Sequence, residues 1–153
     1  PGAAPPPVEE VSGTPAERAE ARAAETGIPA GAMTDAAQLA RVTSLLNDLV
    51  GKSGGEQSFE FLSIGGVRGR SLYEVDLVTR DAMGRVSKRV EGRECRVVYM
   101  EGERRAEIRF WNGYLTYYGK RVKFMGDRYV VHIPDIDPQR WQRSGLRILE
   151  RSR

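Results

Sequence analysis

The spacing of apolar residues along the chain changes near residue 57. Between Thr34 or Asp35 and Gly51, apolar side chains recur every three or four positions, which predicts a helix with one apolar face. From Gln57 onward apolar and polar residues alternate, which predicts half-buried β-strands. A long apolar stripe is unstable in water, so we expect this helix to cover an open edge or face of the sheet. Its apolar positions are Leu39, Val42, Leu45, Leu46 and Leu49.

Turn signals divide the alternating part into about seven or eight short strands between Ser58 and Ile133. The spaces between these strands are too short for crossover helices, so the strands must pair mainly as antiparallel hairpins. We therefore predict a mainly β fold, an antiparallel sandwich, jelly-roll or open barrel with a preceding helical segment. The predicted turns are Gly65–Gly69, Asp81–Gly84, Glu101–Glu103, Asn112–Gly113, Gly119 and Gly126–Asp127.

Four segments follow from these patterns. Residues 1–13 are proline-rich and have no apolar period, which predicts a tail without fixed structure. Residues 14–54 hold two helices, the first of which begins with the cap Thr14, Pro15 and Glu17 and stops at Gly27. Residues 55–138 form the antiparallel β-domain. Residues 139–153 form a basic tail or a short helix.

The net charge of +3 conceals a division along the 153 residues. Residues 1–57 carry four bases and eight acids, whereas residues 68–128 carry fifteen bases and nine acids. The strand-rich part is therefore the basic part. A field of this sign favours anionic partners such as nucleic acid or acidic lipid head groups, although most of these charges are expected to be ordinary solvated surface.

Residues with catalytic or metal-binding chemistry are few and scattered. Cys95 is the one cysteine and should be a small buried hydrophobe, because its neighbours in a strand are charged. His132 has no nucleophile or second histidine beside it, and we expect it to face outward. Asp135 and Asp137 flank prolines, where aspartates form turns and helix caps. We predict no catalytic residue, no metal site and no cofactor, and hence no enzyme. No apolar run is long enough to span a membrane.

Residues 58–134 resemble the periplasmic β-domain of the lipopolysaccharide export permeases. The resemblance lies in the order of small motifs along successive strands rather than in any single residue. The motifs are a Leu-x-x-Val strand at Leu72 and Val75, paired small residues at Gly92 and Cys95, an apolar strand closing at Asn112 and Gly113, and aromatic residues of a last strand at Phe124 and Tyr129.

The resemblance implies a jelly-roll without catalytic residues, whose interior guides lipid acyl chains. On physical grounds, cationic residues at the rim of such a fold would suit phosphorylated head groups. The resemblance also implies a cell-envelope or periplasmic location, although the residues do not exclude a cytoplasmic one. The implied partners are anionic lipids or similar β-domains. The interior residues would be Val75, Leu77, Val97, Ile108, Phe110, Leu115, Val122 and Phe124, and the basic rim would be Lys120, Arg121 and Lys123.

Two other classes of function remain open from the residues alone. Tyrosines interleaved with lysine and arginine are how barrel-like folds hold single-stranded nucleic acid, although acidic residues interrupt the basic stripe here. A purely structural interaction domain is the other alternative. The candidates for nucleic-acid binding are Tyr114, Tyr117, Tyr118, Lys120, Arg121 and Lys123.

Overall fold

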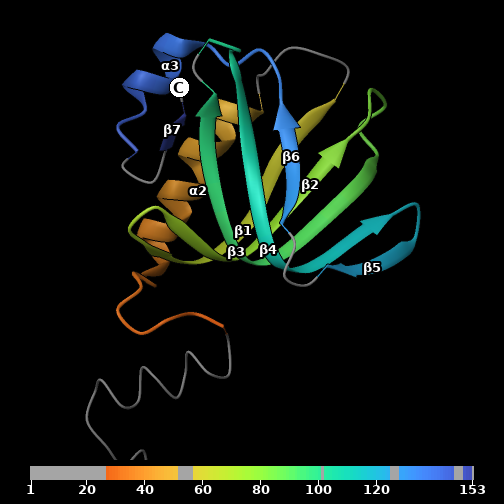
Figure 1. Cartoon of the computed structure of the whole chain (residues 1–153), viewed down its shortest axis with the longest axis horizontal. Helices are drawn as coiled ribbons and strands as arrows, with labels where there is room; N and C mark the ends of the chain where they lie inside the picture. The colour runs from red at the N-terminus through yellow and green to blue at the C-terminus, as the bar shows by residue number, and fades with distance from the viewer. Residues whose placement is uncertain (1–26, 52–56, 101, 125–127, 147–149, 153) are drawn as a thin grey trace, which may run out of the picture.

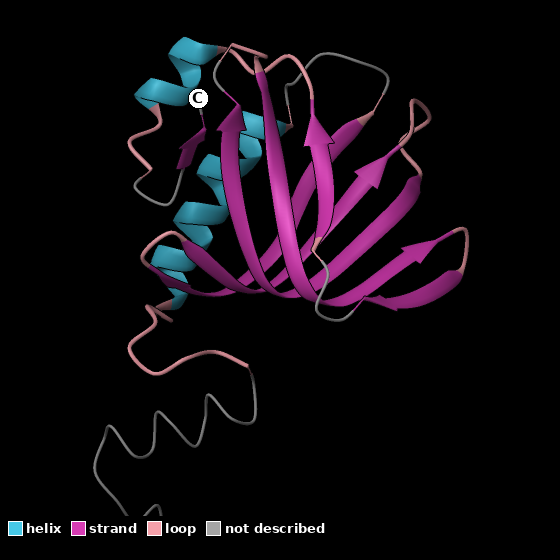
Figure 2. Cartoon of the chain, viewed as in Figure 1, coloured by secondary structure: helices cyan, strands magenta, loops and turns pink. Residues whose placement is uncertain are grey.

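The computed structural model describes residues 27–51, 57–100, 102–124, 128–146 and 150–152. The predicted tail at 1–13 and the first predicted helix, apart from Gly27, lie outside these residues. Strands dominate the described chain (Figures 1 and 2). In order, the elements are α2 (Ala36–Val50), β1 (Ser58–Arg68), β2 (Ser71–Arg80), β3 (Val86–Met100), β4 (Arg105–Tyr117), β5 (Lys120–Phe124), β6 (Tyr129–Ile133), α3 (Pro138–Arg143) and β7 (Glu150–Ser152).

The strands form one open sheet that bends strongly along its length (Figure 1). Strands β1 to β5 follow one another in sequence order and pair antiparallel. Strand β6 pairs with the first half of β4, whereas β5 pairs with its second half. The predicted mainly antiparallel β class is confirmed. The short β7, which the sequence did not predict, pairs parallel to the end of β3.

Helix α2 begins and ends where the capping residues predict. The Asp35 carboxylate accepts a hydrogen bond from the backbone N–H of Gln38 at 3.0 Å, which satisfies one free donor of the first turn. At the other end the N–H of Gly51 donates to the carbonyl of Asn47. The apolar side of the helix buries Leu46 and Leu49 in the core. No helix in the described part of the chain is long and apolar enough to cross a membrane.

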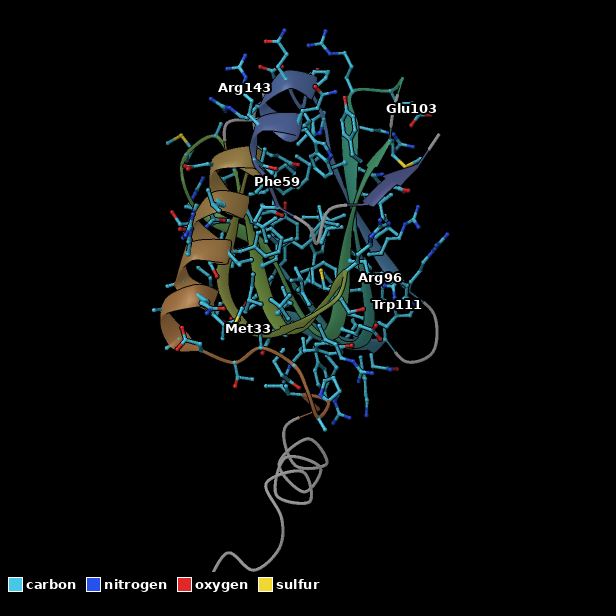
Figure 3. The ribbon with its side chains drawn as sticks, turned by 90° about the vertical axis from the view of Figure 1, so that its left-hand side faces the viewer. Met33, Phe59, Arg96, Glu103, Trp111 and Arg143 are labelled. Carbon is cyan, nitrogen blue, oxygen red and sulfur yellow. The ribbon has the colours of Figure 1, made fainter. Side chains whose placement is uncertain are left out.

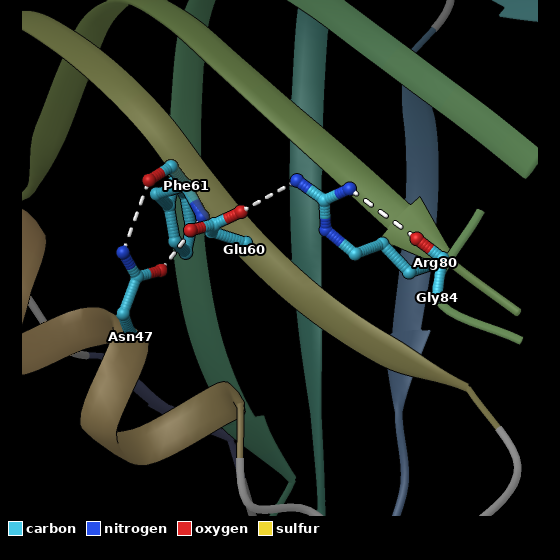
Figure 4. A network of polar contacts seen from close by, with 5 residues as sticks. All are labelled: Asn47, Glu60, Phe61, Arg80 and Gly84. Atoms are coloured by element: carbon cyan, nitrogen blue, oxygen red, sulfur yellow. Dashed lines mark hydrogen bonds and ion pairs between the residues drawn. The ribbon is translucent and has the colours of Figure 1, made fainter. Parts of the chain in front are cut away.

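The contact between α2 and β1 closes an edge of the sheet, as expected for the apolar helix. Strand β1 has β2 on one side only, so the backbone groups of its other side need partners. The Asn47 side chain supplies two of them: its Nδ2 donates to the carbonyl of Phe61 at 3.0 Å, and its Oδ1 accepts from the Phe61 N–H at 2.7 Å (Figure 4). One amide thus pairs with β1 as a neighbouring strand would.

Replacement of Asn47 by alanine should lower the free energy of unfolding by about 1–3 kcal/mol, because it leaves a backbone donor and acceptor without partners. Ser44→Ala, on the exposed side of the same helix, is the control and should change little. Urea titration of both variants measures the difference. Equal midpoints for Asn47→Ala and the unchanged protein would show that the amide contributes nothing to the edge.

The core lies between the bent sheet, α2 and the segment around α3. Its largest fully buried side chains include Phe61, Phe110 and Leu72. Trp141 of α3 is buried and stacks on Tyr99, with ring centroids 4.8 Å apart. Asp137 caps α3 by accepting from the N–H of Gln139, in keeping with its expected role as a helix cap. The predicted burial of Cys95 is confirmed, since its side chain is fully enclosed.

The predicted turn at Asn112–Gly113 is wrong. Both residues lie inside β4, which runs for 13 residues, and β3 beside it runs for 15. Because this signal does not end a strand, the described residues between 58 and 133 form six strands instead of about seven or eight. The predicted turn at Gly65–Gly69 is also shorter than expected, because β1 continues to Arg68. The turn residues at Asp81–Gly84 and Gly119 are confirmed.

What looked like a turn is the point where the sheet bends. On β2 the buried Leu72 and Val75 are three positions apart, so two consecutive residues between them face outward. The same slip of the alternation recurs in register on β3 and β4, where Val75 pairs with Gly92 and Gly92 pairs with Gly113. We call this row the bend. Figure 3 shows Trp111, an outward residue of the bend, on the side of the sheet away from α2.

Candidate functional site: the β4–β5 hairpin and the groove at the bend

Five of the eight residues predicted to line a lipid-binding interior are packed in a closed core. Each has an exposed fraction of 2% or less, and all belong to one cluster of buried side chains. Burial of this degree leaves no apolar surface on them for an acyl chain to contact. These residues are Val75, Leu77, Val97, Ile108 and Phe110.

The other three, Leu115, Val122 and Phe124, lie on the hairpin of β4 and β5. Leu115 and Phe124 are half-buried against the core, but Val122 is 58% exposed, so the prediction that it is an interior residue is wrong. The reason is that β5 pairs only with the last five residues of β4 and extends past the buried part of the sheet.

These three residues form an apolar surface that we call the inner strip. Leu115 and Val122 are directly paired, and Phe124 stacks on Tyr129 with ring centroids 5.8 Å apart. Lysines border the strip. Lys120 lies two positions before Val122 on the same face of β5, and Lys88 on β3 has its Nζ 6.0 Å from the Tyr129 ring. The inner strip is thus apolar, partly open and cationic at its border.

The predicted basic rim is divided between the two faces of β5. Because side chains alternate along a strand, Arg121 and Lys123 point away from Lys120. Both lie over the same ring: the Arg121 guanidinium is 3.8 Å from the Tyr114 ring centroid, and the Lys123 ammonium is 5.9 Å from it. At 3.8 Å the guanidinium makes a cation–π contact with the ring, which restricts the motion of the arginine side chain.

Arg121, Lys123 and Tyr114 form one wall of a groove along the outer side of the bend. The groove has a volume of about 780 Å³, within the range of small-molecule sites. Two of its residues, Glu74 and Asn112, have positive φ of 51° and 55° in the middle of strands. Non-glycine residues rarely adopt this conformation, and such strain clusters at functional sites. The lining residues are Ser63, Glu74, Val75, Asp76, Glu91, Gly92, Arg93, Asn112, Gly113, Tyr114, Arg121 and Lys123.

The carboxylates of the groove are largely neutralised by arginines. Asp76 accepts two hydrogen bonds from Arg89, from Nε at 2.9 Å and from Nη2 at 2.5 Å. Glu91 lies 3.9 Å from Arg89 and 3.8 Å from Arg121. Burial raises the pKa of the Glu74 carboxyl above its usual range, and the charge of Arg93 opposes this shift. With Arg89 included, four basic side chains face three acidic ones.

Cys95, His132 and the two late aspartates form no chemical site. Burial, with the charge of Glu94, raises the pKa of the Cys95 thiol well above its usual range, which keeps it protonated. His132 is exposed as expected, and its Nδ1 lies 2.7 Å from Nη1 of Arg105. In the part of the chain that the structure describes, no three His, Cys, Asp or Glu side chains come close enough to share a metal ion.

The residues of these surfaces that the sequence interpretation missed include Lys88, Glu74 and Arg93. Each lies on β2 or β3, far along the chain from the hairpin, and joins it only through strand pairing. The alternation of side chains along β5 could have shown that Lys120 lies on the opposite face from Arg121 and Lys123.

Comparison of the chain with models of protein families, with curated proteins and with solved structures finds no match in any of the three.

Proposed function

We propose that the protein is a non-catalytic module that binds an amphipathic anionic lipid on the inner strip of the β4–β5 hairpin. The observation that carries the proposal is that an exposed Val122, paired with the half-buried Leu115 and on the same face of β5 as Phe124, lies beside the cations Lys88 and Lys120. Acyl chains would lie on the apolar side chains, and the ammonium groups would hold the phosphate.

The tip of the hairpin supports the same proposal. Tyr118 is 78% exposed and Tyr117 is 46% exposed, and no acidic residue occurs between residues 114 and 124. Tyrosine favours the boundary between water and apolar lipid, and each basic residue near an anionic membrane adds about 1 kcal/mol of attraction. The resemblance to the periplasmic β-domain of the export permeases is in keeping with lipid binding and with a cell-envelope location.

Nucleic-acid binding is less well supported by the same residues. A base would have to stack on an open tyrosine face, but the Tyr114 ring already has the Arg121 guanidinium on it at 3.8 Å. Tyr117 and Tyr118 meet edge to face, with centroids 4.3 Å apart, instead of forming two parallel platforms. We therefore take the anionic lipid as the ligand and test the oligonucleotide beside it.

Vesicles of phosphatidylcholine with and without phosphatidylglycerol, mixed with the protein and floated on a density gradient, test the proposal. The protein should bind only the anionic vesicles. Val122→Asp should weaken binding at least tenfold, because it places a negative charge in the inner strip. Lys120→Gln should weaken it roughly fivefold, the effect of about 1 kcal/mol per basic residue.

Arg143→Gln is the control, because it removes the same charge from the exposed surface of α3, away from the β4–β5 hairpin. It should change vesicle binding by no more than about twofold. A labelled oligothymidine is titrated in parallel at the same salt concentration. Binding of the oligonucleotide without binding of anionic vesicles would replace the lipid proposal with the nucleic-acid one.

A further inference from the structure

The groove at the bend is a second surface, separate from the inner strip. The inner strip uses Lys120, Val122 and Phe124 of β5, whereas the groove uses Arg121 and Lys123 of the same strand. Because these two sets alternate along the strand, they lie on opposite faces of the hairpin. A ligand in the groove would therefore not compete for the side chains of the inner strip.

We propose that this groove binds a phosphate ester, with Arg121 as its main contact and Lys123 and Arg93 beside it. Arg121 is already held in place by the Tyr114 ring at 3.8 Å, so little side-chain freedom is lost when it binds an anion. Its side chain is 56% exposed, and its ion pair with Glu91 is long, at 3.8 Å. The guanidinium thus keeps N–H donors for an oxyanion.

The other walls of the groove complete a site for a group with several oxygens. Arg93 comes from β3 and is exposed, and Lys123 comes from β5. A phosphate ester has three strong acceptor oxygens and can therefore accept hydrogen bonds from cations on neighbouring strands at the same time. The carboxylate of Asp76 does not oppose this, because two hydrogen bonds tie it to Arg89.

Backbone strain at the bend is a second observation that indicates a functional role for this groove. Of the five non-glycine residues with positive φ in the described part of the chain, Arg104, Tyr118 and Asp135 lie in turns or loops, where such angles are common. The remaining two lie within strands, and both line the groove. The bend therefore places a glutamate and an asparagine with strained backbones in the lining of one groove, as is common at functional sites.

Titration of the ¹⁵N-labelled protein with glycerol 3-phosphate at constant ionic strength tests the proposal by amide chemical shifts. Shifts should centre on residues 91–93, 112–114 and 121–123. Arg121→Gln should weaken binding about tenfold, and Tyr114→Leu should weaken it several-fold by freeing the arginine from the ring. Arg143→Gln, a control that removes one positive charge from the exposed surface of α3, away from both the groove and the inner strip, should leave the affinity within about twofold.

Equal shifts with sodium chloride at the same ionic strength, or equal losses in Arg121→Gln and Arg143→Gln, would overturn the proposal. Vesicles containing phosphatidic acid distinguish a lipid phosphate from a free one. If Tyr114→Leu weakens only vesicle binding, the phosphate belongs to a lipid; if it weakens glycerol 3-phosphate binding, a free ester suffices. The result is separable from that for the inner strip, which depends on Lys120 and Val122 instead.

Discussion

Truncation of Phe110 to alanine should lower the free energy of unfolding by ~3–5 kcal/mol. The Phe110 ring has no exposed surface, and it packs against the backbone of Gly92 on the neighbouring strand, where an added Cβ would lie 2.5 Å from Cδ1 of the ring. Gly92 leaves just enough room for the Phe110 ring. Removal of the ring therefore creates a cavity, which the two paired strands are too constrained to fill. Urea or thermal unfolding followed by circular dichroism measures the loss.

The matched control for Phe110→Ala removes an aromatic ring from the surface of the same protein. Tyr118→Ala, at a position 78% exposed, should change the free energy of unfolding by no more than about 0.5 kcal/mol. If Phe110→Ala also costs less than about 1 kcal/mol, the ring does not pack in a closed core. The interior would then be an open groove, and the predicted lipid contact at Phe110 would again be the better interpretation.

Local patterns in the sequence predicted the ends of α2 and the class of the sheet. Asp35 and Gly51 act through hydrogen bonds to residues three or four positions away. Both partners therefore lie within one short segment of the sequence. Alternation of apolar and polar residues is equally local, because it depends only on the direction of successive side chains. These features hold in the structure because no distant contact overrides them.

The bend could not be predicted because its cause is not local. Asn-Gly between apolar residues is the strongest short-range signal for a hairpin, and at Asn112–Gly113 that signal is misleading. The asparagine does adopt the positive φ that such a turn requires, at 55°. The strand continues because β3 pairs with β4 on both sides of this point, from Lys88 to Met100. The Asn-Gly signal thus predicted the positive φ of Asn112 correctly. Pairing of β4 with β3 made this residue part of a bend in a continuous strand instead of a hairpin turn.

The candidate surfaces were predicted only in part, for the same reason. The basic residues and tyrosines of the hairpin are adjacent in sequence, so their grouping was visible. Whether an apolar residue on the hairpin is buried depends on how far the rest of the sheet extends beneath it. Leu115 and Val122 are paired, yet one is half-buried and the other 58% exposed, because the core ends between them.

The second large effect is expected from Gly113→Ala, which should lower the free energy of unfolding by about 3 kcal/mol or more, the upper end of overpacking costs. An added Cβ would overlap the carbonyl oxygen of Glu91 and lie 2.8 Å from the Cα of Gly92. Both obstacles are backbone atoms of a paired strand, so no side-chain rotation relieves them. The strands must move apart at the bend, where their register holds the sheet together.

Gly69→Ala separates this steric effect from the general cost of replacing a glycine. Gly69 has a φ of 60° and nothing within 4 Å of an added Cβ, so alanine there should cost only the roughly 1–2 kcal/mol of a left-handed residue. Unfolding of both variants in urea, with amide shifts of residues 91–93 as a local probe, tests the difference. An equal or smaller loss in Gly113→Ala would mean that β3 and β4 do not meet closely at the bend. The groove, which Gly92 and Gly113 line, would then lack the rigid walls that its proposed ligand requires.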